Sequence, residues 1–308
     1  MKVLVTGAAG FIGSHITEYL LKTGKNVIGV DNLSTGRLSN ISKFRGDIEF
    51  LELDILNLTE EHLEGVTHIV HQAALGSVPA SIDSPQEYNK VNIEGFVHLL
   101  ELARKLNIKR VVYASSAAVY GTDSLDVKEE DSIGAPLSPY AITKYVDELY
   151  ANLYGYLYGL ECIGLRYFNV FGPKQDLNGS YAAVIPAFIT SLLNSKAPTI
   201  NGTGEATRDF VYVQNIVQAN ILALTTQNAQ AFNSVFNVGN AKATSILDLY
   251  NTIASIIGTS IKPVHGPIRP GDIKHSVANI SKATAYLNYN PTYSVVQGLY
   301  QTVEYYKK

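Results

Sequence analysis

The stretch Val3-Leu4-Val5-Thr6-Gly7-Ala8-Ala9-Gly10-Phe11-Ile12-Gly13 decides the fold, because it joins an apolar strand to a helix through three glycines. In such a turn one glycine permits the tight bend, one lets the backbone approach a pyrophosphate, and one permits close packing of helix on strand. The amino end of the helix then offers free N–H groups to the phosphates. The spacing G-x-x-G-x-x-G therefore predicts a dinucleotide site, although glycine trios also occur in purely structural turns.

An acidic residue at the end of the second predicted strand strengthens this prediction. Asp31 stands where a carboxylate accepts hydrogen bonds from the adenosine ribose and repels a 2′-phosphate, which favours NAD over NADP. The alternative is that Asp31 caps a turn together with Asn32 and Ser34, and both interpretations are compatible. Arg37 would weaken the preference for NAD if it reached the ribose.

Short apolar runs alternate with amphipathic helical patterns through the first half of the chain. The expected strands are residues 2–6, 26–31, 48–53, 68–71, 110–115 and 161–167, and the expected helices are residues 11–22, 89–106 and 139–156. This alternation predicts an α/β fold with a doubly wound parallel sheet of the Rossmann type, covered on both faces. Asp54 and Ile55 follow the third strand, and we expect them to border the adenine ring.

After residue 168 the pattern changes to short elements separated by glycine and proline, with one more expected strand at residues 235–239. We predict an NAD-binding domain over residues 1–168, to which residues 212–239 return. A smaller C-terminal substrate-binding lobe is expected over residues 169–211 and 240–308.

The bulk composition excludes several classes of protein. The 308 residues contain 24 basic and 27 acidic side chains, and this near balance argues against a nucleic-acid-binding surface. No apolar run approaches the roughly 20 residues of a membrane span, and the N-terminal run is too short for a signal peptide, so a cytoplasmic setting is expected. The single cysteine, Cys162, is expected to pack in a core strand, and the scattered histidines show no metal-binding spacing.

A tyrosine and a lysine four residues apart are the candidate proton-transfer pair. Tyr140 and Lys144 share one helix face, and Ser138-Pro139 is a typical helix start. A free phenol has a pKa of ~10, and a nearby lysine cation and nicotinamide cation would both lower it. Because the chain has 20 tyrosines, this spacing alone is weak evidence. Ser115 and Ser116 at the end of the fifth strand make the combination specific, since strand ends face the ligand crevice.

With these motifs the chain resembles the extended short-chain dehydrogenase/reductase family, and within it the UDP-hexose 4-epimerases, in particular the UDP-N-acetylglucosamine 4-epimerases. The matching stretches are Gln72-Ala73-Ala74-Leu75-Gly76-Ser77-Val78-Pro79, Leu137-Ser138-Pro139-Tyr140-Ala141, Leu165-Arg166-Tyr167-Phe168-Asn169-Val170-Phe171-Gly172, Asn178-Gly179-Ser180-Tyr181-Ala182-Ala183-Val184-Ile185-Pro186 and Gly202-Thr203-Gly204-Glu205-Ala206-Thr207-Arg208-Asp209-Phe210.

The resemblance implies an enzyme that binds NAD and a UDP-sugar. Tyr140 would take the proton of the 4-hydroxyl, Lys144 would bind the nicotinamide ribose, and Ser116 would orient the sugar. The other implied NAD contacts are Gly7, Gly10, Phe11, Ile12, Gly13, Asp31, Asn32, Asp54, Ile55, Gln72, Ala73, Ala74, Asn92, Ser115 and Tyr167. The other implied substrate contacts are Gly76, Ser77, Asn169, Ala183, Val184, Asn201, Arg208, Arg269, Asp272 and Ser276.

The implied reaction is inversion at C4 through a transient 4-keto sugar, with no metal. Related dehydratases and decarboxylases have carboxylates where this chain has Ala117 and Ala118, and alanine cannot transfer a proton. Ser276 replaces a bulky tyrosine of glucose-restricted relatives, so we expect UDP-GlcNAc and UDP-GalNAc as preferred substrates, with activity on UDP-Glc and UDP-Gal. The alternatives are an epimerase restricted to non-acetylated sugars, a net oxidoreductase and a non-catalytic NAD sensor. A homodimer through the helices at residues 89–106 and 139–156 is also expected.

Overall fold

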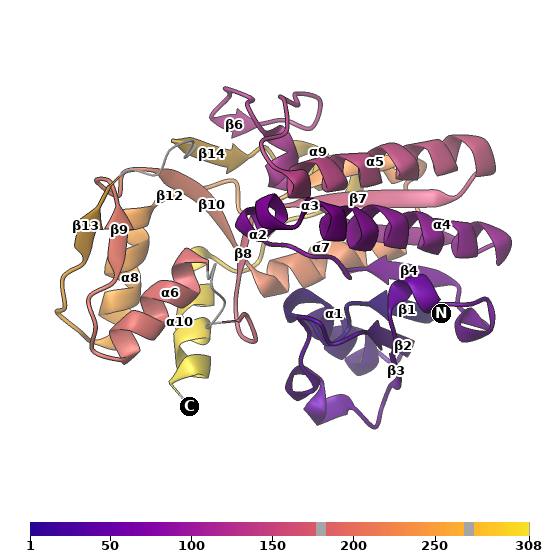
Figure 1. Cartoon of the computed structure of the whole chain (residues 1–308), viewed down its shortest axis with the longest axis horizontal. Coiled ribbons are helices and arrows are strands. Elements are labelled where there is room, and N and C mark those ends of the chain that lie inside the picture. Colours follow the sequence, from indigo (N-terminus) through magenta and orange to yellow (C-terminus); the bar gives the residue numbers. More distant parts are fainter. Residues whose placement is uncertain (177–182, 268–273, 308) are drawn as a thin grey trace.

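The computed structural model describes residues 1–176, 183–267 and 274–307, which form a large α/β part and a smaller C-terminal part (Figure 1). In the described chain a seven-stranded sheet has the order β11-β7-β5-β4-β1-β2-β3, with every neighbouring pair parallel. Its strands are β1 (Lys2–Thr6), β2 (Asn26–Asp31), β3 (Glu49–Glu52), β4 (His68–His71), β5 (Arg110–Ser116), β7 (Glu161–Tyr167) and β11 (Ser234–Val238). The predicted doubly wound parallel sheet is confirmed, and the late strand β11 lies at its edge, paired with β7.

Helices cover both faces of this sheet, and successive side chains of each strand pack alternately against the helices on one face and on the other. Val3 and Val5 of β1 belong to the core beneath α1 (Phe11–Lys22) and α7 (Val213–Thr225), whereas Leu4 belongs to the core beneath α4 (Gly95–Lys105) and α5 (Pro139–Tyr158). Successive side chains of a strand point to opposite faces, so a continuous apolar run fits a sheet covered on both sides. Cys162 of β7 is fully buried in the second of these cores, as predicted, and burial raises the pKa of its thiol to about 12.

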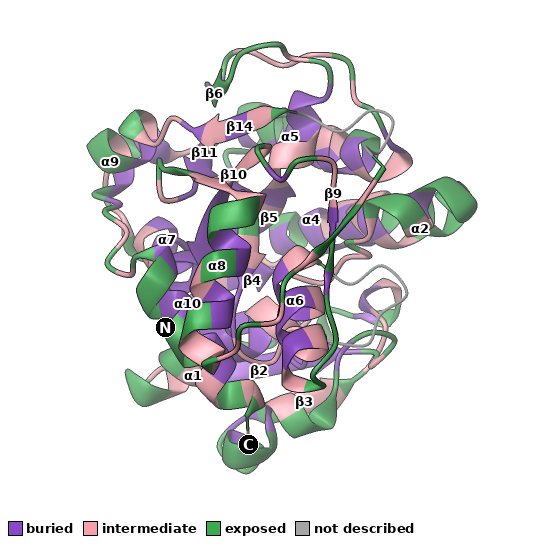
Figure 2. Ribbon diagram, turned by 90° about the vertical axis from the view of Figure 1, so that its left-hand side faces the viewer, coloured by how far each residue is buried: buried purple, intermediate pink, exposed green. Residues whose placement is uncertain are grey.

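Short strands form two further sheets, which contain mostly C-terminal segments and also β6 from the first half of the chain. A five-stranded sheet contains β12 (Ala243–Ser245), β10 (Thr207–Tyr212), β14 (His275–Ala278) and β6 (Val127–Lys128), with β8 (Asn169–Phe171) pairing with β10, while β13 (Val264–Gly266) pairs with β9 (Thr199–Asn201). Helices α6 (Val184–Leu193), α8 (Ile246–Ile257) and α10 (Val295–Tyr306) enclose a third core, and α8 and α10 expose their outer faces (Figure 2). The remaining helices are α2 (Val78–Asp83), α3 (Pro85–Tyr88) and α9 (Ser281–Leu287).

Two predicted helices have different bounds in the structure. The helix expected at 89–106 begins at Pro85 as α3, continues as a π-helical segment (Asn89–Glu94) and ends as α4. Proline suits a first helical position, and the π segment accompanies an inward-pointing Asn92 that bonds the Leu75 backbone. The helix expected at 139–156 ends at Tyr158, where Gly159 adopts φ 71°.

In the described residues, no helix combines the length and the apolar character that a membrane crossing requires.

Candidate active site

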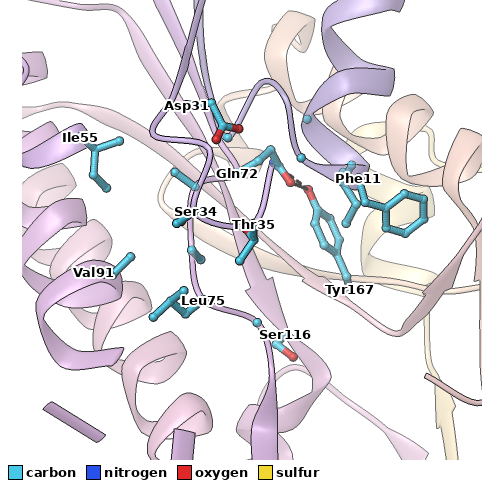
Figure 3. Close-up of a pocket in the computed structure, with 18 of the residues that line it drawn as sticks. Phe11, Asp31, Ser34, Thr35, Ile55, Gln72, Leu75, Val91, Ser116 and Tyr167 are labelled. Atoms are coloured by element: carbon cyan, nitrogen blue, oxygen red, sulfur yellow. Dashed lines mark hydrogen bonds between the residues drawn. The ribbon is translucent and has the colours of Figure 1, made fainter. Parts of the chain in front are cut away.

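A cavity of about 400 Å³ opens at the carboxyl ends of the seven-stranded sheet. Residues that follow β1, β2, β3 and β4 line it, together with the last residues of β5 and β7, as the doubly wound topology predicts. Figure 3 shows Asp31 at one end of this cavity and Ser116 at the other, with Gln72 and Tyr167 between them.

The three glycines of the loop at residues 7–13, called the glycine loop, form a cradle without side chains at one wall of the cavity. Gly7 adopts φ 67°, and a Cβ there would lie 2.8 Å from the backbone nitrogen of Ala73. A Cβ on Gly13 would lie 2.0 Å from the Gly7 oxygen, so only glycine lets α1 pack this close to the turn. Gly10 is the N-cap of α1 and offers no side chain to its first N–H groups. The amino end of α1 is therefore suited to an anion such as a pyrophosphate.

Asp31 both stabilises a turn and lines the cavity. Its carboxylate accepts hydrogen bonds from the backbone N–H groups of Ala9 (2.9 Å) and Leu33 (2.8 Å), so the turn-capping alternative is observed. Burial raises the pKa of Asp31, and these backbone bonds oppose the rise. Arg37 pairs with Asp176 at 2.8 Å and is not among the lining residues of the described cavity.

The structure brings Ser116, Tyr140 and Lys144 to the same cavity. Ser138 begins α5, because its hydroxyl accepts a hydrogen bond from Ala141 N–H, and this places Tyr140 in the first turn. Tyr140 packs edge-on against Tyr88, with ring centroids 6.4 Å apart. Lys144 lies one turn further along, and its side chain is only 2% exposed.

A second tyrosine in the cavity, Tyr167, is held by side-chain hydrogen bonds to its hydroxyl. The Tyr167 hydroxyl accepts hydrogen bonds from Asn220 Nδ2 (2.7 Å) and Gln72 Nε2 (3.0 Å), a contact visible in Figure 3. Burial raises the pKa of Tyr167 well above its ordinary value. This phenol is therefore suited to structural support rather than to proton transfer. Asn220 of α7 was absent from the sequence prediction, since a single amide within a helix gives no signal.

Most of the predicted NAD contacts line the cavity, and the side chains of Ser115 and Asn92 hold its wall in place. The predicted residues that line the cavity are Gly7, Gly10, Phe11, Ile12, Gly13, Asp31, Asn32, Asp54, Ile55, Gln72, Ala73, Ala74, Ser115, Ser116, Tyr140, Lys144 and Tyr167. The hydroxyl of Ser115, however, donates to Glu148 behind the wall. Asn92 is fully buried, and its amide bonds the Leu75 backbone and Thr143 Oγ1.

Most predicted substrate contacts lie outside this cavity. Gly76 lines it, whereas Ser77, Asn169, Ala183, Val184, Asn201, Arg208 and Ser276 do not. Arg208 and Ser276 are neighbours in register on β10 and β14, and Asn169 on β8 donates to the Asp209 carbonyl. Arg269 and Asp272 lie outside the described residues.

Sequence reasoning missed several residues of the wall. They are Ser34, Thr35, Leu53, Leu75, Val91, Ala114, Phe168, Val170 and Gln175. Most of them follow or end a strand of the parallel sheet, so the strand-end rule could have found them. Val91 and Gln175 had no such signal. Within the three described ranges, no group of three or more His, Cys, Asp or Glu residues could hold a metal ion.

Comparison with known proteins agrees with this geometry. The model of the NAD dependent epimerase/dehydratase family matches residues 3–239. The chain belongs to this family. Its cofactor is NAD, and the residues present fit that group, because the cradle at Gly7 and Gly13 has no room for a Cβ and the Asp31 carboxylate lines the same cavity, where it could accept hydrogen bonds from a ribose.

Three solved structures of the family cover almost the whole chain. The UDP-N-acetylglucosamine 4-epimerase of Methanobrevibacter ruminantium M1, in complex with UDP-N-acetylmuramic acid, is 39% identical over 99% of this chain and 98% of its own, with a TM-score of 0.95. The UDP-glucose 4-epimerase of Thermotoga maritima with UDP-glucose is 37% identical over 100% and 99%, with a TM-score of 0.92. The UDP-glucuronic acid 4-epimerase of Bacillus cereus, with UDP-glucuronic acid and NAD, is 33% identical over 100% and 99%, with a TM-score of 0.91.

Proposed function

We propose that this protein inverts carbon 4 of UDP-hexoses, with UDP-GlcNAc and UDP-GalNAc preferred and UDP-Glc and UDP-Gal also accepted. The chain is an isomerase of the UDP-sugar 4-epimerase type. The observation that supports the proposal most directly is the convergence of Ser116, Tyr140 and Lys144 on the cavity that the glycine loop borders.

The residues would divide the chemistry as follows. When bound, NAD supplies a reversible hydride acceptor. Tyr140 would take the proton of the 4-hydroxyl and return it, while the Ser116 hydroxyl would hold the sugar, and both residues line the cavity. The Lys144 ammonium would bind the nicotinamide ribose and favour the ionised phenol of Tyr140.

The residues beside Ser116 favour simple epimerisation over elimination. Ala117 and Ala118 follow it directly and offer no group that could protonate a leaving hydroxyl or remove a second proton. Inversion at C4 needs neither group, because the same phenol acts in both directions. The two alanines therefore support the epimerase over the dehydratases of the family.

The preference for acetamido sugars is the finer part of the proposal, and it rests on side-chain volume. Ser276 is small, and it lies on β14 beside Arg208. A serine leaves room for a 2-acetamido group where glucose-restricted relatives have tyrosine. Kinetics of Ser276→Tyr with UDP-GlcNAc and UDP-glucose test this point: we expect UDP-GlcNAc turnover to fall and UDP-glucose turnover to persist, and unchanged UDP-GlcNAc turnover would remove Ser276 as the determinant.

The decisive experiment on the activity is a panel of UDP-sugars, followed by NMR at C4. The panel includes UDP-GlcNAc, UDP-GalNAc, UDP-Glc, UDP-Gal and UDP-glucuronic acid, the last because the Bacillus cereus relative is named for it. We expect inverted product without accumulation of NADH, and deuterium placed on C4 should remain with the sugar. Accumulating NADH would support a net oxidoreductase instead, and bound NAD without any turnover would support a sensor.

The proposal also covers the segments that bind each ligand, the location of the protein and its assembly. We propose that residues 1–168 and 212–239 bind NAD, that residues 169–211 and 240–308 bind the UDP-sugar, and that the protein acts in the cytoplasm. We further propose a homodimer through α5. This helix exposes an apolar stripe of side chains at helical spacing, namely Ile142, Leu149, Leu153, Tyr156 and Leu157. Exposed apolar stripes of this kind are typical of protein interfaces.

A further inference from the structure

A buried carboxylate lies directly behind the lysine of the site. Asp147 is three residues after Lys144 on α5, and its Oδ2 is 3.1 Å from Lys144 Nζ. The two side chains are only 1% and 2% exposed. Within the described chain this is the one hydrogen bond that the Lys144 ammonium makes.

We propose that Asp147 is a positioning residue, which holds the Lys144 ammonium from behind and sets how strongly its charge acts on Tyr140. The inference rests on the proposed roles of these two residues. An ammonium has three N–H donors. With one donor directed at Asp147, the other two are left for the cavity, where a ribose and the phenol of Tyr140 would lie.

The pair is poorly explained as a stabilising contact alone. Asp147 Oδ1 is buried and has no hydrogen-bond partner among the described residues. A buried ion pair gains little net stability, because the desolvation of both charges opposes their attraction, and an unpartnered oxygen adds to that cost. Burial raises the pKa of Asp147, while the Lys144 ammonium opposes the rise and favours the carboxylate. Strongly perturbed carboxylates beside a cavity are typical of functional sites.

The surroundings leave Lys144 as the main partner of Asp147. Glu148, the next residue, is engaged by Arg166 at 2.8 Å and by Ser115. His71 of β4 lies near Lys144, and burial keeps its pKa at about 3, so it is neutral. Tyr113 of β5 lies near Asp147, and burial raises the pKa of its phenol well above the usual value.

The remaining ionisable groups around α5 act elsewhere. Cys162 of β7 is a neutral thiol, because burial raises its pKa to about 12, and Glu101 of α4 bonds Tyr154 further along α5. The Asp147 carboxylate is thus the nearest negative charge that opposes Lys144.

The chain provides a matched control for this inference. Lys128 and Asp123 form a second buried lysine–aspartate pair, at 3.3 Å and with side chains 2% and 7% exposed. Neither residue lines the cavity. Asp123→Asn therefore removes the same kind of charge away from the proposed machinery.

The test measures ionisation of the Tyr140 phenol in the NAD-loaded protein without any sugar. The signal is the near-ultraviolet absorbance difference between each protein and its Tyr140→Phe counterpart across pH. Asp147→Asn keeps an acceptor for Lys144 but removes the opposing charge, so the transition should move to lower pH by about one unit, for charges roughly 10 Å apart. Asp123→Asn should leave it in place.

A second variant separates the effect of the Asp147 charge from its effect on the position of Lys144. Asp147→Leu also removes the acceptor, so Lys144 loses its anchor, and kcat should fall about tenfold while Asp147→Asn loses less. The inference is overturned if Asp147→Asn ionises Tyr140 at the wild-type pH, or if Asp123→Asn shifts the transition equally. Because the titration needs no sugar, a protein that inverts no UDP-hexose can still pass it, and failure of the proposed function stays distinguishable from failure of this inference.

Discussion

Two phenols share the cavity, and their hydrogen bonds predict different tasks. Tyr167 accepts two side-chain hydrogen bonds and is 8% exposed, whereas Tyr140 is half-buried and makes no side-chain hydrogen bond through its hydroxyl within the described residues. A phenol already held by amides donates and accepts with little freedom. A phenol without such partners, beside a buried ammonium, can exchange a proton with a ligand.

Removing the two hydroxyls separately should show this difference. Tyr140→Phe should lower kcat by about 10²–10⁴, the usual contribution of a positioned proton-transfer group, while NAD stays bound. Tyr167→Phe, the matched control, removes a hydroxyl from the same cavity and should lower kcat far less. Turnover of UDP-GlcNAc and the NAD content of the purified proteins are the measurements. A Tyr140→Phe variant within tenfold of wild type would contradict the assignment.

His71 predicts how the stability of the fold depends on pH. The Thr6 hydroxyl accepts N–H bonds from Gln72 and Ala73, so it donates its own proton to His71 Nδ1 at 2.8 Å. Full burial lowers the pKa of His71 to about 3, with Lys144 adding to the effect. The unfolded chain binds a proton near pH 6.5, so the stability linked to this residue is complete above that value and is lost as the pH falls towards 3.

His71→Asn removes this titration and keeps an acceptor near Thr6. Between pH 7 and pH 5 the free energy of unfolding should fall by about 2 kcal/mol more in wild type than in the variant. Denaturant unfolding at both pH values gives the comparison. The slope with pH is the informative quantity, since the smaller side chain also lowers stability at every pH. Equal slopes would show that His71 is not held neutral.

At the scale of elements, the contact between β1, its turn and α1 depends on the absence of side chains. Gly13→Ala would place a methyl group 2.0 Å from the Gly7 oxygen, so the helix must move away from the turn. We expect a loss of stability of about 1–3 kcal/mol, the usual cost of overpacking, and weaker retention of NAD. Gly46→Ala is the control, because a Cβ there meets nothing within 4 Å. Equal NAD content in both variants would show that the close packing at Gly13 does not contribute to NAD binding.

The elements also show what the sequence could predict. β1, β2, β4 and β7 and the helix α1 have the predicted bounds, because continuous apolar runs and a clear 3.6-residue pattern specify them locally. The segment from Pro85 to Lys105 was predicted less well, since it contains a π-helical turn in which Asn92 bonds the Leu75 backbone, outside the helix. Such a tertiary contact has no local sequence signal.

The same limit applies to the site. The glycine loop, Asp31, Ser116 and the Tyr140–Lys144 pair follow local rules about strand ends and helix faces, and all of them line one cavity. Asn220 and Asp147 were not predicted, because their importance arises from neighbours that only the folded chain supplies. The predicted substrate contacts came from resemblance alone, and most of them lie on the smaller part, away from this cavity.

At the scale of the whole molecule, α5 connects the chemistry to the proposed dimer. Its buried face contains Lys144 and Asp147, and its outer face contains the apolar stripe defined above. α4 and α5 pack against each other on one side of the sheet (Figure 1). A second copy that covered the stripe would therefore also steady the helix that holds Tyr140.

A charge in this stripe should separate the copies. Leu153 is 46% exposed on α5, so Leu153→Glu should leave a single chain folded but place a carboxylate in any apolar contact there. We expect light scattering to give twice the chain mass for wild type and a single chain mass for the variant. Tyr300→Glu on α10, at 59% exposure, is the matched control and should remain dimeric. If wild type is a monomer, or if Leu153→Glu keeps the wild-type mass, the α5 stripe does not join two copies. The turnover of the monomeric variant tests whether the dimer matters for the site. If kcat falls while the NAD content is retained, contact with the partner copy contributes to holding α5, and with it Tyr140, in place.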